Sequence, residues 1–457
     1  MALYFFVGIG GTGMSALAQI VLRRGNEVWG SDRSRDRGLN RRLFNHLKKF
    51  GVRLFPQDGS GVVEGVDYVV ASAAVEDTVP EMVSAKKFGI PVLRRAELLA
   101  EHFNGARGVA VGGTSGKSTT AAMTGWILHA AGRDPTVVNG AVMRNFEKTS
   151  PPGNAVIGTS DLFVIESDES DGSIALYNPA VSVVTNISKD HRPVPELRRL
   201  FRDFGRRASE CVVANADCPE VSSLGFGKTK TFFFSVSRSS DLKARDVRLD
   251  GLRSTFTAGG AVFRLKLPGL HNVYNALAAA AAAKAVGVAE AVSADALTRF
   301  EGVRQRFEVI GEAAGVTVVE DFAHNPEKIA AILGALNPLG RRLLIVFQPH
   351  GYGPTAFLKD ELVESLSSNM SDSDVLYMPE IYYAGGTAAR TVSSRDIADA
   401  VRKNGRNAVF YADRRRIVTA IADEAKEGDM VLVMGARDPS LTDFCRRTLA
   451  ALRKKHG

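Results

Sequence analysis

The sequence has few cysteines and no long hydrophobic segment. Its 457 residues include three cysteines, Cys211, Cys218 and Cys445, which form neither a CxxC pair nor a metal-ligand spacing. A cysteine-based metal or redox site is therefore not expected, and a reducing cytoplasm fits this pattern. No apolar run approaches the roughly 20 residues that span a membrane, and the Ala-rich stretch 276–287 favours a soluble helix. The N-terminus lacks the basic flank and cleavage site of a signal peptide, so we expect a cytoplasmic protein without a membrane partner.

Charge is abundant but not concentrated in one region. Lys and Arg number 58 against 50 Asp and Glu, which gives a formal net charge of +8. The basic residues are scattered, and no recognised nucleic-acid motif accompanies them. We therefore expect small anionic substrates as partners rather than nucleic acid, while the oligomeric state is not indicated. The chain length favours about three domains.

Residues 107–120, RGVAVGGTSGKSTT, predict a strand, a glycine-containing turn and a helix. Such a turn cradles nucleotide phosphates, because its backbone N–H groups point at the anion and the helix N-terminus favours negative charge. The predicted nucleotide-binding residues are Gly113, Thr114, Ser115, Gly116, Lys117, Ser118 and Thr119. Lys117 would neutralise terminal phosphate oxygens and the Ser118 hydroxyl would hold magnesium. A strict P-loop has glycine five residues before Gly116, where this chain has Val111, so a plain strand-to-helix turn is the alternative.

The N-terminal region has the beginning of a Rossmann-like domain, expected to span residues 1–105. A strand is followed by a GxGxxG turn, a helix and a second strand that ends at Ser31 and Asp32. The glycines of the turn are Gly8, Gly10 and Gly13. Asp32 lies about 20 residues on, where such folds place a ribose-contacting carboxylate. A bound nucleotide or sugar nucleotide is favoured, and a turn needed only for packing is the alternative.

The second domain is expected to span residues 106–301 and to carry a metal site. Two of its strands, in DLFVIESDESDGS and AVSVVTNISKDH, deliver Glu166 and His191 at their carboxyl ends. These ends share one rim with the phosphate turn in a parallel sheet. Ser118, Glu166 and His191 are therefore the predicted metal ligands, and magnesium suits the two oxygen ligands. A solvated acidic loop and an ordinary polar histidine are the alternatives.

The end of the second domain combines hairpins with a long helix. Alternating segments within 229–268, TKTFFFSVS and RSTFTAGGAVFRLKLPG, predict a small antiparallel sheet. The helix that follows has His271, Asn272 and Asn275 at its head, and the two asparagines share a helical face. Their amides could bind an adenine edge, whereas a simple capping role for Asn272 is the alternative.

The third domain is expected to span residues 302–457. Strand-like and helical segments alternate again, which predicts a second Rossmann-like sheet. Polar residues follow its predicted strands, notably Asp321, His324 and His350. A domain with such strand ends, placed across a cleft from the phosphate turn, would complete a site by closing.

With these landmarks in place, the chain resembles the Mur ligase family, ATP-dependent enzymes that join a carboxylate to an amine during cell-wall precursor assembly. The matching segments, in family order, are VGIGGTGMSALA, GTSGKSTT, ESDESDGS, TNISKDH, PGLHNVYNALAA, GVRQRFEVIG, EDFAHNPEKI, VFQPHGY and MGARD. The resemblance is strongest to the alanine-adding branch and its relative that reattaches a recycled tripeptide. It implies a three-domain α/β fold, with Rossmann-like N- and C-terminal domains around a P-loop central domain.

The resemblance also implies a reaction and a set of residue roles. ATP with Mg²⁺ would phosphorylate the carboxylate of a UDP-N-acetylmuramate-type peptidoglycan precursor, and an amine would attack the acyl phosphate. The first domain would hold the UDP-sugar through Gly10, Gly11, Gly13, Ser31, Asp32 and Ser72. His271, Asn272 and Asn275 would lie near adenine, and Arg306 would reach toward ATP from the third domain. His324 or Asp321 would orient or deprotonate the amine, and His350 would contact substrate.

The chain departs from the family pattern at QPHGYGPT. The alanine-adding branch has arginines where this chain has Gly351 and Pro354, and those arginines would bind the carboxylate of the amino acid. Losing such a contact removes about 1.5 to 3 kcal/mol per hydrogen bond, so the acceptor is left open. One alternative is a Mur-like ligase acting on another acidic metabolite or cofactor precursor. A second is a dinucleotide-binding oxidoreductase or nucleotide-sensing module, which leaves the phosphate turn and Glu166 without a role.

Overall fold

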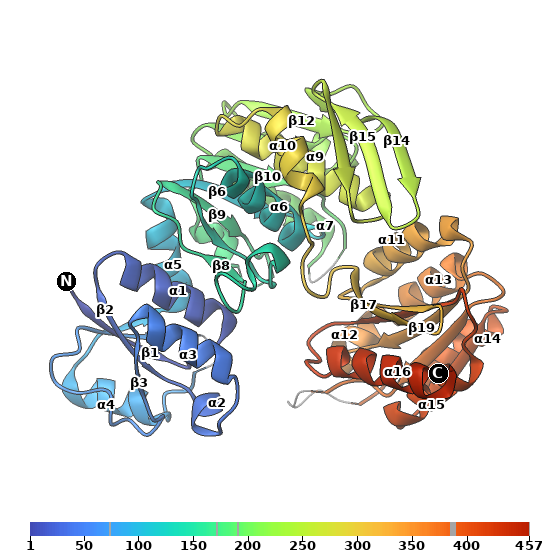
Figure 1. Cartoon of the computed structure of the whole chain (residues 1–457). Coiled ribbons are helices and arrows are strands. Elements are labelled where there is room, and N and C mark those ends of the chain that lie inside the picture. Colours follow the sequence, from blue (N-terminus) through green and yellow to red (C-terminus); the bar gives the residue numbers. More distant parts are fainter. Residues whose placement is uncertain (73–74, 171, 190–191, 384–389, 457) are drawn as a thin grey trace. The chain divides into compact units, whose positions relative to one another are not determined.

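The computed structural model describes residues 1–72, 75–170, 172–189, 192–383 and 390–456 (Figure 1). The chain forms two compact units: residues 1–246, 256–264 and 274–301 make unit 1, and residues 247–255, 265–273 and 302–457 make unit 2. The predicted three-domain α/β architecture is confirmed, with a parallel N-terminal sheet, a central sheet joined by a small antiparallel sheet, and a mixed C-terminal sheet. The domain boundaries at residues 105 and 301 stay predictions.

The N-terminal sheet has five parallel strands in the order β3-β2-β1-β4-β5. The strands are β1 (Leu3–Val7), β2 (Glu27–Ser31), β3 (Arg53–Phe55), β4 (Tyr68–Ala71) and β5 (Val92–Arg94). The helices are α1 (Thr12–Arg23), α2 (Arg33–Asp36), α3 (Arg41–Phe50), α4 (Pro80–Phe88) and α5 (Arg95–Asn104). Alternation along β1 separates two cores: Phe6 faces the core shared with α1, α3 and α5, while Phe5 and Val7 face α4.

The central sheet has eight strands in the order β13-β12-β11-β10-β6-β9-β7-β8, and its short β8 is antiparallel. Its strands are β6 (Arg107–Gly112), β7 (Thr136–Val138), β8 (Ala155–Val156), β9 (Leu162–Glu166), β10 (Val181–Val184), β11 (Cys211–Asn215), β12 (Thr231–Ser235) and β13 (Leu242–Lys243). The helices of this region are α6 (Lys117–Ala130), α7 (Val194–Arg206), α8 (Pro219–Ser222), α9 (Leu270–Ala285) and α10 (Glu290–Thr298). Strand β6 lies between β9 and β10, so its carboxyl end is flanked on both sides.

The hairpin prediction for residues 229–268 is correct in one part and wrong in another. A small sheet contains β14 (Arg245–Asp250), β15 (Arg253–Ala258) and β16 (Ala261–Leu265) in that order. Gly259 and Gly260 connect β15 to β16 with φ values of +56° and +77°, as a tight two-residue hairpin turn requires. The segment TKTFFFSVS instead forms β12, which joins β11 in parallel. Its buried Phe234 favours a place in the larger sheet, because a buried aromatic strand needs cover on both faces.

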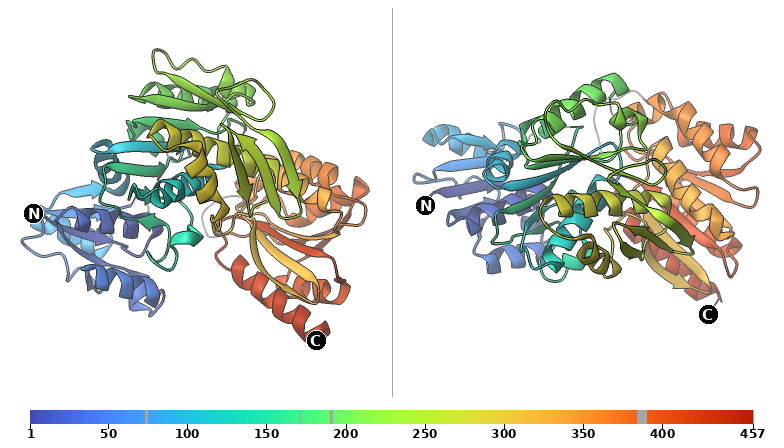
Figure 2. Two further views of the ribbon diagram at one scale, coloured as in Figure 1. Left: turned by 45° about the horizontal axis from the view of Figure 1, so that its top comes forward. Right: turned by 90° about the horizontal axis from the view of Figure 1, so that it is seen from above.

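The C-terminal sheet has six strands in the order β17-β18-β22-β19-β20-β21, with only β17 antiparallel. The strands are β17 (Glu308–Ala313), β18 (Val316–Asp321), β19 (Leu343–Gln348), β20 (Val375–Pro379), β21 (Asn407–Tyr411) and β22 (Met430–Gly435). The helices are α11 (Pro326–Leu336), α12 (Tyr352–Phe357), α13 (Lys359–Asn369), α14 (Ser394–Lys403), α15 (Arg414–Glu424) and α16 (Leu441–His456). Two buried cores cover its faces: α11, α13 and α14 pack on one, and α15 and α16 on the other (Figure 2). It is the Rossmann-like layering that the sequence predicted.

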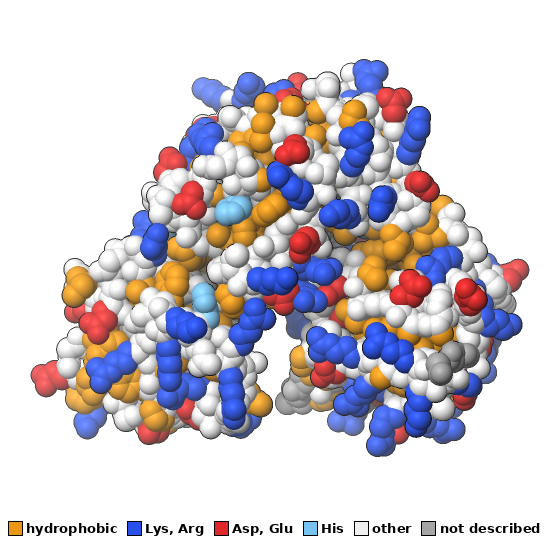
Figure 3. All heavy atoms as spheres, viewed as in Figure 1, with side chains coloured by type: hydrophobic (Ala, Val, Ile, Leu, Met, Phe, Trp, Pro, Cys, Tyr) orange, Lys and Arg blue, Asp and Glu red, His pale blue; other side chains and the backbone are white. Residues whose placement is uncertain are grey.

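The surface shows no segregation of charge on the face drawn in Figure 3, where Lys and Arg lie among acidic and apolar side chains. Within the described residues, no helix combines the length and apolar character that crossing a membrane requires.

Candidate active site

The phosphate-type turn lies at the carboxyl end of β6, the strand with flanking parallel partners on both sides. In register, Val111 pairs with Glu166 of β9, and Gly112 pairs with Val184 of β10. Phe201 and Phe204 of α7 pack close to Gly112, where an added Cβ would lie 3.2 Å from each ring. The fold therefore brings the segments after β6, β9 and β10 to one rim, as the sequence predicted.

Two glycines give the turn its shape. Gly113 has a φ of +136°, and a Cβ there would overlap the Thr185 hydroxyl. Gly116 has a φ of +81° directly before α6, and a Cβ there would overlap the Asn275 side chain. Both positions therefore combine a backbone conformation that L-residues avoid with a close approach, so only glycine fits.

Asn186, which sequence reasoning did not single out, fixes the turn. Its Oδ1 accepts hydrogen bonds from Thr114 Oγ1 at 2.8 Å and Ser115 N at 2.9 Å, and its Nδ2 donates to Ser115 O at 3.0 Å. Thr185 adds a bond from Oγ1 to Ser115 O at 2.7 Å. The signal was present in TNISKDH, but only the parallel pairing of β6 and β10 shows which polar residue of that segment meets the turn.

Lys117 is held inside the turn by a buried carboxylate. Its Nζ donates to Gly113 O and to Glu169 Oε2, both at 2.8 Å, and the Glu169 side chain is 2% exposed. Burial by itself lowers the pKa of Lys117, but the nearby carboxylates of Glu169, Glu166 and Asp168 outweigh it and leave that pKa raised. The lysine therefore stays charged at neutral pH.

The predicted metal ligands Ser118 and Glu166 lie side by side. Ser118 Oγ donates to Glu166 Oε1 at 2.8 Å, and Gly140 N donates to the other carboxylate oxygen at 2.7 Å. A Cβ at Gly140 would lie 2.6 Å from Glu166 Oε2, so this glycine permits the contact. His191, the third predicted ligand, lies outside the described residues. Among the described residues, no three Asp, Glu, His or Cys side chains converge as a metal cluster.

These residues fit a magnesium-bound polyphosphate. A hydroxyl and one carboxylate are hard oxygen ligands, and Mg²⁺ typically takes one or two carboxylates together with substrate phosphates and water. Ser115 Oγ is buried and has no hydrogen-bond partner within the described chain, as expected of a group placed to meet a phosphate. Thr119 is buried in the first turn of α6, and its predicted contact with the nucleotide stays a prediction.

The head of α9 differs from the prediction in detail. Asn275 is buried, and its Oδ1 accepts from Thr120 Oγ1 at 3.2 Å, so its amide supports the turn and α6. Asn272 Nδ2 donates to Pro268 O at 2.8 Å and lies 3.1 Å from His271 Nε2. Burial lowers the pKa of His271 to about 4, so this ring is neutral at pH 7. An adenine-binding role for the three residues stays a prediction.

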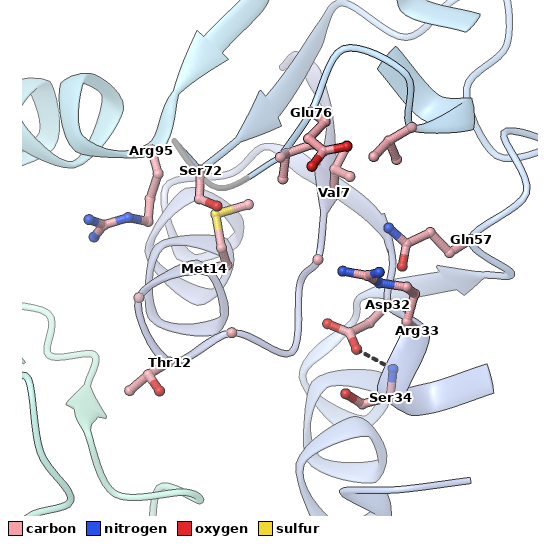
Figure 4. A pocket seen from close by; sticks show the side chains of 15 residues that line it. Val7, Thr12, Met14, Asp32, Arg33, Ser34, Gln57, Ser72, Glu76 and Arg95 are labelled. Carbon is pink, nitrogen blue, oxygen red and sulfur yellow. Dashed lines mark hydrogen bonds between the residues drawn. The ribbon is translucent and has the colours of Figure 1, made fainter. Parts of the chain in front are cut away.

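A separate pocket of about 460 Å³ opens at the glycine turn after β1 (Figure 4). The carboxyl ends of the five parallel strands, the turn and α1 supply its lining, which is where ligands bind in open α/β sheets. The lining residues are Val7, Gly8, Gly11, Thr12, Gly13, Met14, Asp32, Arg33, Ser34, Gln57, Ser72, Val75, Glu76, Val79 and Arg95. Arg95 and Ser72 lie at one end, while Asp32, Arg33 and Gln57 lie toward the other (Figure 4). The pocket includes four predicted substrate residues, Gly11, Gly13, Asp32 and Ser72.

Asp32, Gly10 and Ser31 have structural contacts of their own. Asp32 accepts from Gly10 N at 2.8 Å and from Ser34 N at 2.7 Å, so it ties the glycine turn to the start of α2. A Cβ at Gly10 would lie 2.7 Å from the Phe44 ring and 2.8 Å from the Asp32 carboxylate. Ser31 is buried and donates to Glu81 Oε1 at 2.8 Å. Gly10 and Ser31 are not among the lining residues, and their predicted contact with substrate stays untested.

Sequence reasoning missed the cationic and amide groups of this pocket. Arg33, Arg95 and Gln57 line it, and a Cβ at Gly13 would lie 2.7 Å from an Arg95 guanidinium nitrogen. Arg33 directly follows Asp32, which is the signal that could have identified it. Arg95 is 82 positions after Gly13, and only the order of the strands brings it to the glycine turn.

In unit 2, polar residues gather at the carboxyl edge of the C-terminal sheet. Asp321, at the end of β18, accepts from Phe307 N and Ala323 N, both at 2.7 Å. Burial raises the pKa of Asp321, although these two N–H groups and Arg306 act against the rise. Both carboxylate oxygens serve the backbone, which favours His324 over Asp321 as the group that handles an amine.

His324 and His350 form a pair of rings with centroids 5.3 Å apart. His324 Nδ1 lies 2.8 Å from Phe322 O, and because a carbonyl only accepts, Nδ1 carries the proton. In the neutral ring, Nε2 is then the nitrogen that can accept a proton. The structure thus brings together His324 and His350, which come from different strand ends.

Arg306 is ordered within a strained turn of the same unit. Its guanidinium lies 4.2 Å above the Phe322 ring, and its Nη1 donates to Gln305 O at 3.1 Å. The flanking residues Gln305 and Phe307 have φ values of +58° and +48°, which are costly for residues with side chains. Such a conformation persists only where the surrounding structure holds the backbone, so the backbone at Arg306 is fixed from both sides.

Comparisons with known proteins agree along the whole chain. Residues 4–107 match the catalytic domain of the Mur ligase family, residues 111–283 the Mur ligase middle domain, and residues 305–437 the Mur ligase glutamate ligase domain. The UDP-N-acetylmuramate–L-alanine ligase of Myxococcus xanthus is 36% identical, over 97% of this chain and 95% of that protein. The enzyme of the same name from Persephonella marina is 33% identical, over 98% of each chain.

Solved structures show the same likeness. The crystal structure of UDP-N-acetylmuramate-alanine ligase from Thermotoga maritima has a TM-score of 0.78 and 25% identity, covering 99% of this chain and 100% of that one. A murein peptide ligase from Psychrobacter arcticus has a TM-score of 0.68 and 25% identity, covering 99% of each chain.

Proposed function

Because the chain belongs to the Mur ligase family, we propose that it joins the carboxylate of UDP-N-acetylmuramate to the amino group of L-alanine. It is an ATP-dependent ligase of peptidoglycan precursor synthesis, as the sequence predicted. The proposal adds the donor, the acceptor and the residues that act on each. Two relatives named UDP-N-acetylmuramate–L-alanine ligase support it, because each aligns with more than 95% of this chain.

The observation that carries the proposal is the arrangement around the phosphate-type turn. Lys117 is paired with Glu169 and is 14% exposed, and Ser118 and Glu166 lie at hydrogen-bond distance beside it. In phosphoryl transfer the protein mainly positions groups and neutralises charge, so this set suits the γ-phosphate of ATP. Magnesium held by Ser118 and Glu166 would withdraw charge from the phosphate oxygens. Arg306 is proposed as a further positive charge on ATP.

The residues of the N-terminal pocket suit the UDP-sugar. Backbone N–H groups at the start of α1, the hydroxyls of Thr12 and Ser72, and the guanidinium groups of Arg33 and Arg95 favour a diphosphate. The carboxylate of the sugar is the nucleophile toward ATP, which gives an acyl phosphate and ADP. His324 then accepts the proton of the attacking amine through Nε2, and phosphate leaves.

Product analysis by mass spectrometry tests the proposal. The enzyme is incubated with ATP, MgCl₂, UDP-N-acetylmuramate and L-alanine, and the expected products are UDP-N-acetylmuramoyl-L-alanine, ADP and phosphate in equal amounts. ADP release should require both the donor and the amine. ATP turnover that is indifferent to both substrates contradicts the proposal.

A different acceptor amine is the second candidate, and one observation favours it. Gly351 and Pro354 stand where the resemblance predicts carboxylate-binding arginines, and Gly351 has a φ of +70°. A pool of all amino acids, supplied in place of L-alanine, identifies the acceptor by the mass that the donor gains. If a product of another mass forms and none forms from L-alanine, the acceptor is a different amino acid and the ligase reaction is otherwise as proposed.

A further inference from the structure

Two loops at the carboxyl edge of the C-terminal sheet are joined by backbone hydrogen bonds. Gly351 N donates to Tyr382 O and Tyr382 N donates to Pro349 O, both at 2.8 Å. The same pairing places His350 opposite Tyr382. Residues 349–351 after β19 and residues 381–383 after β20 therefore form one surface beside the His324–His350 pair.

Arg390 lies on an aromatic shelf formed by these two loops. Its guanidinium carbon is 5.4 Å from the ring centroid of Tyr352 and 5.5 Å from that of Tyr383. The two rings are 5.3 Å apart, and Tyr352 packs with Ile381 and Val392 in a small buried cluster. The shelf thus has its own apolar support.

The charge of Arg390 is available to a ligand. The side chain is exposed, and within the described residues it forms no salt bridge with a carboxylate. Stacking on two rings restrains a guanidinium without using its N–H groups, because the attraction comes from the ring faces. Five donors in a planar fork remain to bind an anion, and a carboxylate matches that fork.

We propose that Arg390, held by Tyr352 and Tyr383, binds the carboxylate of the acceptor amino acid. This inference rests on the proposed ligase function and specifies its acceptor subsite. The acceptor is then an amino acid with a free carboxylate, whose amine faces the His324–His350 pair. Arg390 supplies from the loop after β20 the charge that Gly351 and Pro354 do not supply from the loop after β19.

The competing cation is Arg437, which follows β22 at the same sheet edge. Its φ of +61° is unusual for a residue with a side chain, and Gly435 of β22 pairs with Gln348 of β19, two residues before His350. Arg437 is also exposed. The shelf distinguishes Arg390, because the structure shows what holds its guanidinium in place.

Discrimination between L-alanine and L-alaninamide tests the proposal. The amide lacks the negative charge, so the wild type should prefer L-alanine through this contact. Arg390→Gln should raise KM for L-alanine about 10- to 100-fold, as expected for losing a charge-assisted pair. It should leave kcat and the KM of ATP within about twofold, and the ratio of kcat/KM for L-alanine over L-alaninamide should fall by the same factor as KM rises. Arg390→Lys should recover part of the ratio.

The matched control is Arg395→Gln. Arg395 is also stacked on an aromatic ring, with its guanidinium carbon 4.5 Å from the Phe410 centroid, and it is exposed in the first turn of α14. This variant should keep the wild-type ratio. An unchanged ratio in Arg390→Gln overturns the proposal, as does a ratio that falls only in Arg437→Gln. A wild type that forms no amide with L-alanine instead contradicts the proposed function, and that measurement comes first.

Discussion

Two glycine-rich turns in this chain have the same local plan and different surroundings. Each follows a strand and leads into a helix: residues 8–13 include the first two residues of α1, and residues 113–118 include the first two residues of α6. The second turn contains Lys117, which is paired with the buried Glu169. The first has Thr12 as the first residue of its helix, and its cations, Arg33 and Arg95, come from other segments of the pocket.

The difference shows how one backbone motif is adapted to two kinds of anion. A lysine held by a buried carboxylate, with a second carboxylate and a hydroxyl beside it, suits a polyphosphate that carries magnesium. Two arginines around a pocket of about 460 Å³ suit a diphosphate whose larger attached groups must also be bound. The glycine pattern alone is common to both turns, so the residues around each turn decide its ligand.

The largest effect is expected from Lys117→Met. Loss of the lysine removes the charge that faces the phosphates, and we expect kcat to fall about 10²- to 10³-fold. It also leaves Glu169 buried without its partner, which should lower the free energy of unfolding by about 3 kcal/mol. Steady-state ADP release and thermal unfolding measure the two losses.

A second substitution separates these two losses. Lys117→Met combined with Glu169→Gln should regain most of the stability, because the unpaired charge is gone, but none of the activity. Lys284→Met, which removes an exposed lysine paired with Glu290, should change neither property by more than a small amount. Recovery of activity in the double variant would show that Lys117 acts only by neutralising Glu169.

The next effect compares glycines of the two turns. Gly113→Ala combines a φ of +136° with overlap of the Thr185 hydroxyl, so we expect a loss of more than about 3 kcal/mol and no measurable ATP binding. Gly8→Ala has a φ of +72° but no atom within 4 Å of the new Cβ, so the cost should be about 1 kcal/mol. Thermal unfolding with and without MgATP measures both. Equal losses of unfolding free energy in the two variants would mean that the overlap with Thr185 adds no cost at Gly113.

A smaller and more selective effect is expected from the residue that anchors each turn. Asn186→Asp replaces the amide donor facing Ser115 O by an acceptor, which should raise KM for ATP about tenfold. Asp32→Asn replaces one of the oxygens that accept from Gly10 N and Ser34 N, which should raise KM for the UDP-sugar by a similar factor. Each variant should leave the other KM within about twofold. A change in both constants would show that the two turns are coupled.

The sequence predicted the fold and the family because those rest on local order along the chain. Strand, glycine turn and helix recur at the right intervals, and the family, the fold class and the ligase activity are confirmed. The strand ends also predicted that Ser118 and Glu166 would meet, since the carboxyl ends of parallel strands share an edge. His191 falls outside the described residues, so its metal role stays a prediction.

Contacts made across the fold could not be predicted in the same way. Asn186 meets the turn from 71 positions away, and Ser31 donates to Glu81, 50 positions on. No periodicity encodes such pairs, because they depend on strand order and on the direction of single side chains. Arg390 could not be predicted for the same reason, because it stacks on Tyr383 after β20 and on Tyr352 after β19.

The smallest effect on activity concerns protonation at the head of α9, the helix whose Asn275 supports the second turn. Burial lowers the pKa of His271 to about 4, below the value near 6.5 of an unfolded histidine. Between pH 6.5 and 4 the unfolded chain binds more protons at this position, so stability should fall as pH falls through that window and stay level above it. At pH 5 we expect a loss of about 2 kcal/mol relative to pH 7, and His271→Gln should remove that part of the pH dependence. Thermal unfolding of both proteins at pH 5 and pH 7 measures the difference. The KM of ATP should be the same at pH 7 and pH 8, because the ring is neutral at both pH values. Parallel pH profiles in the two proteins would show that folding does not lower the pKa of His271.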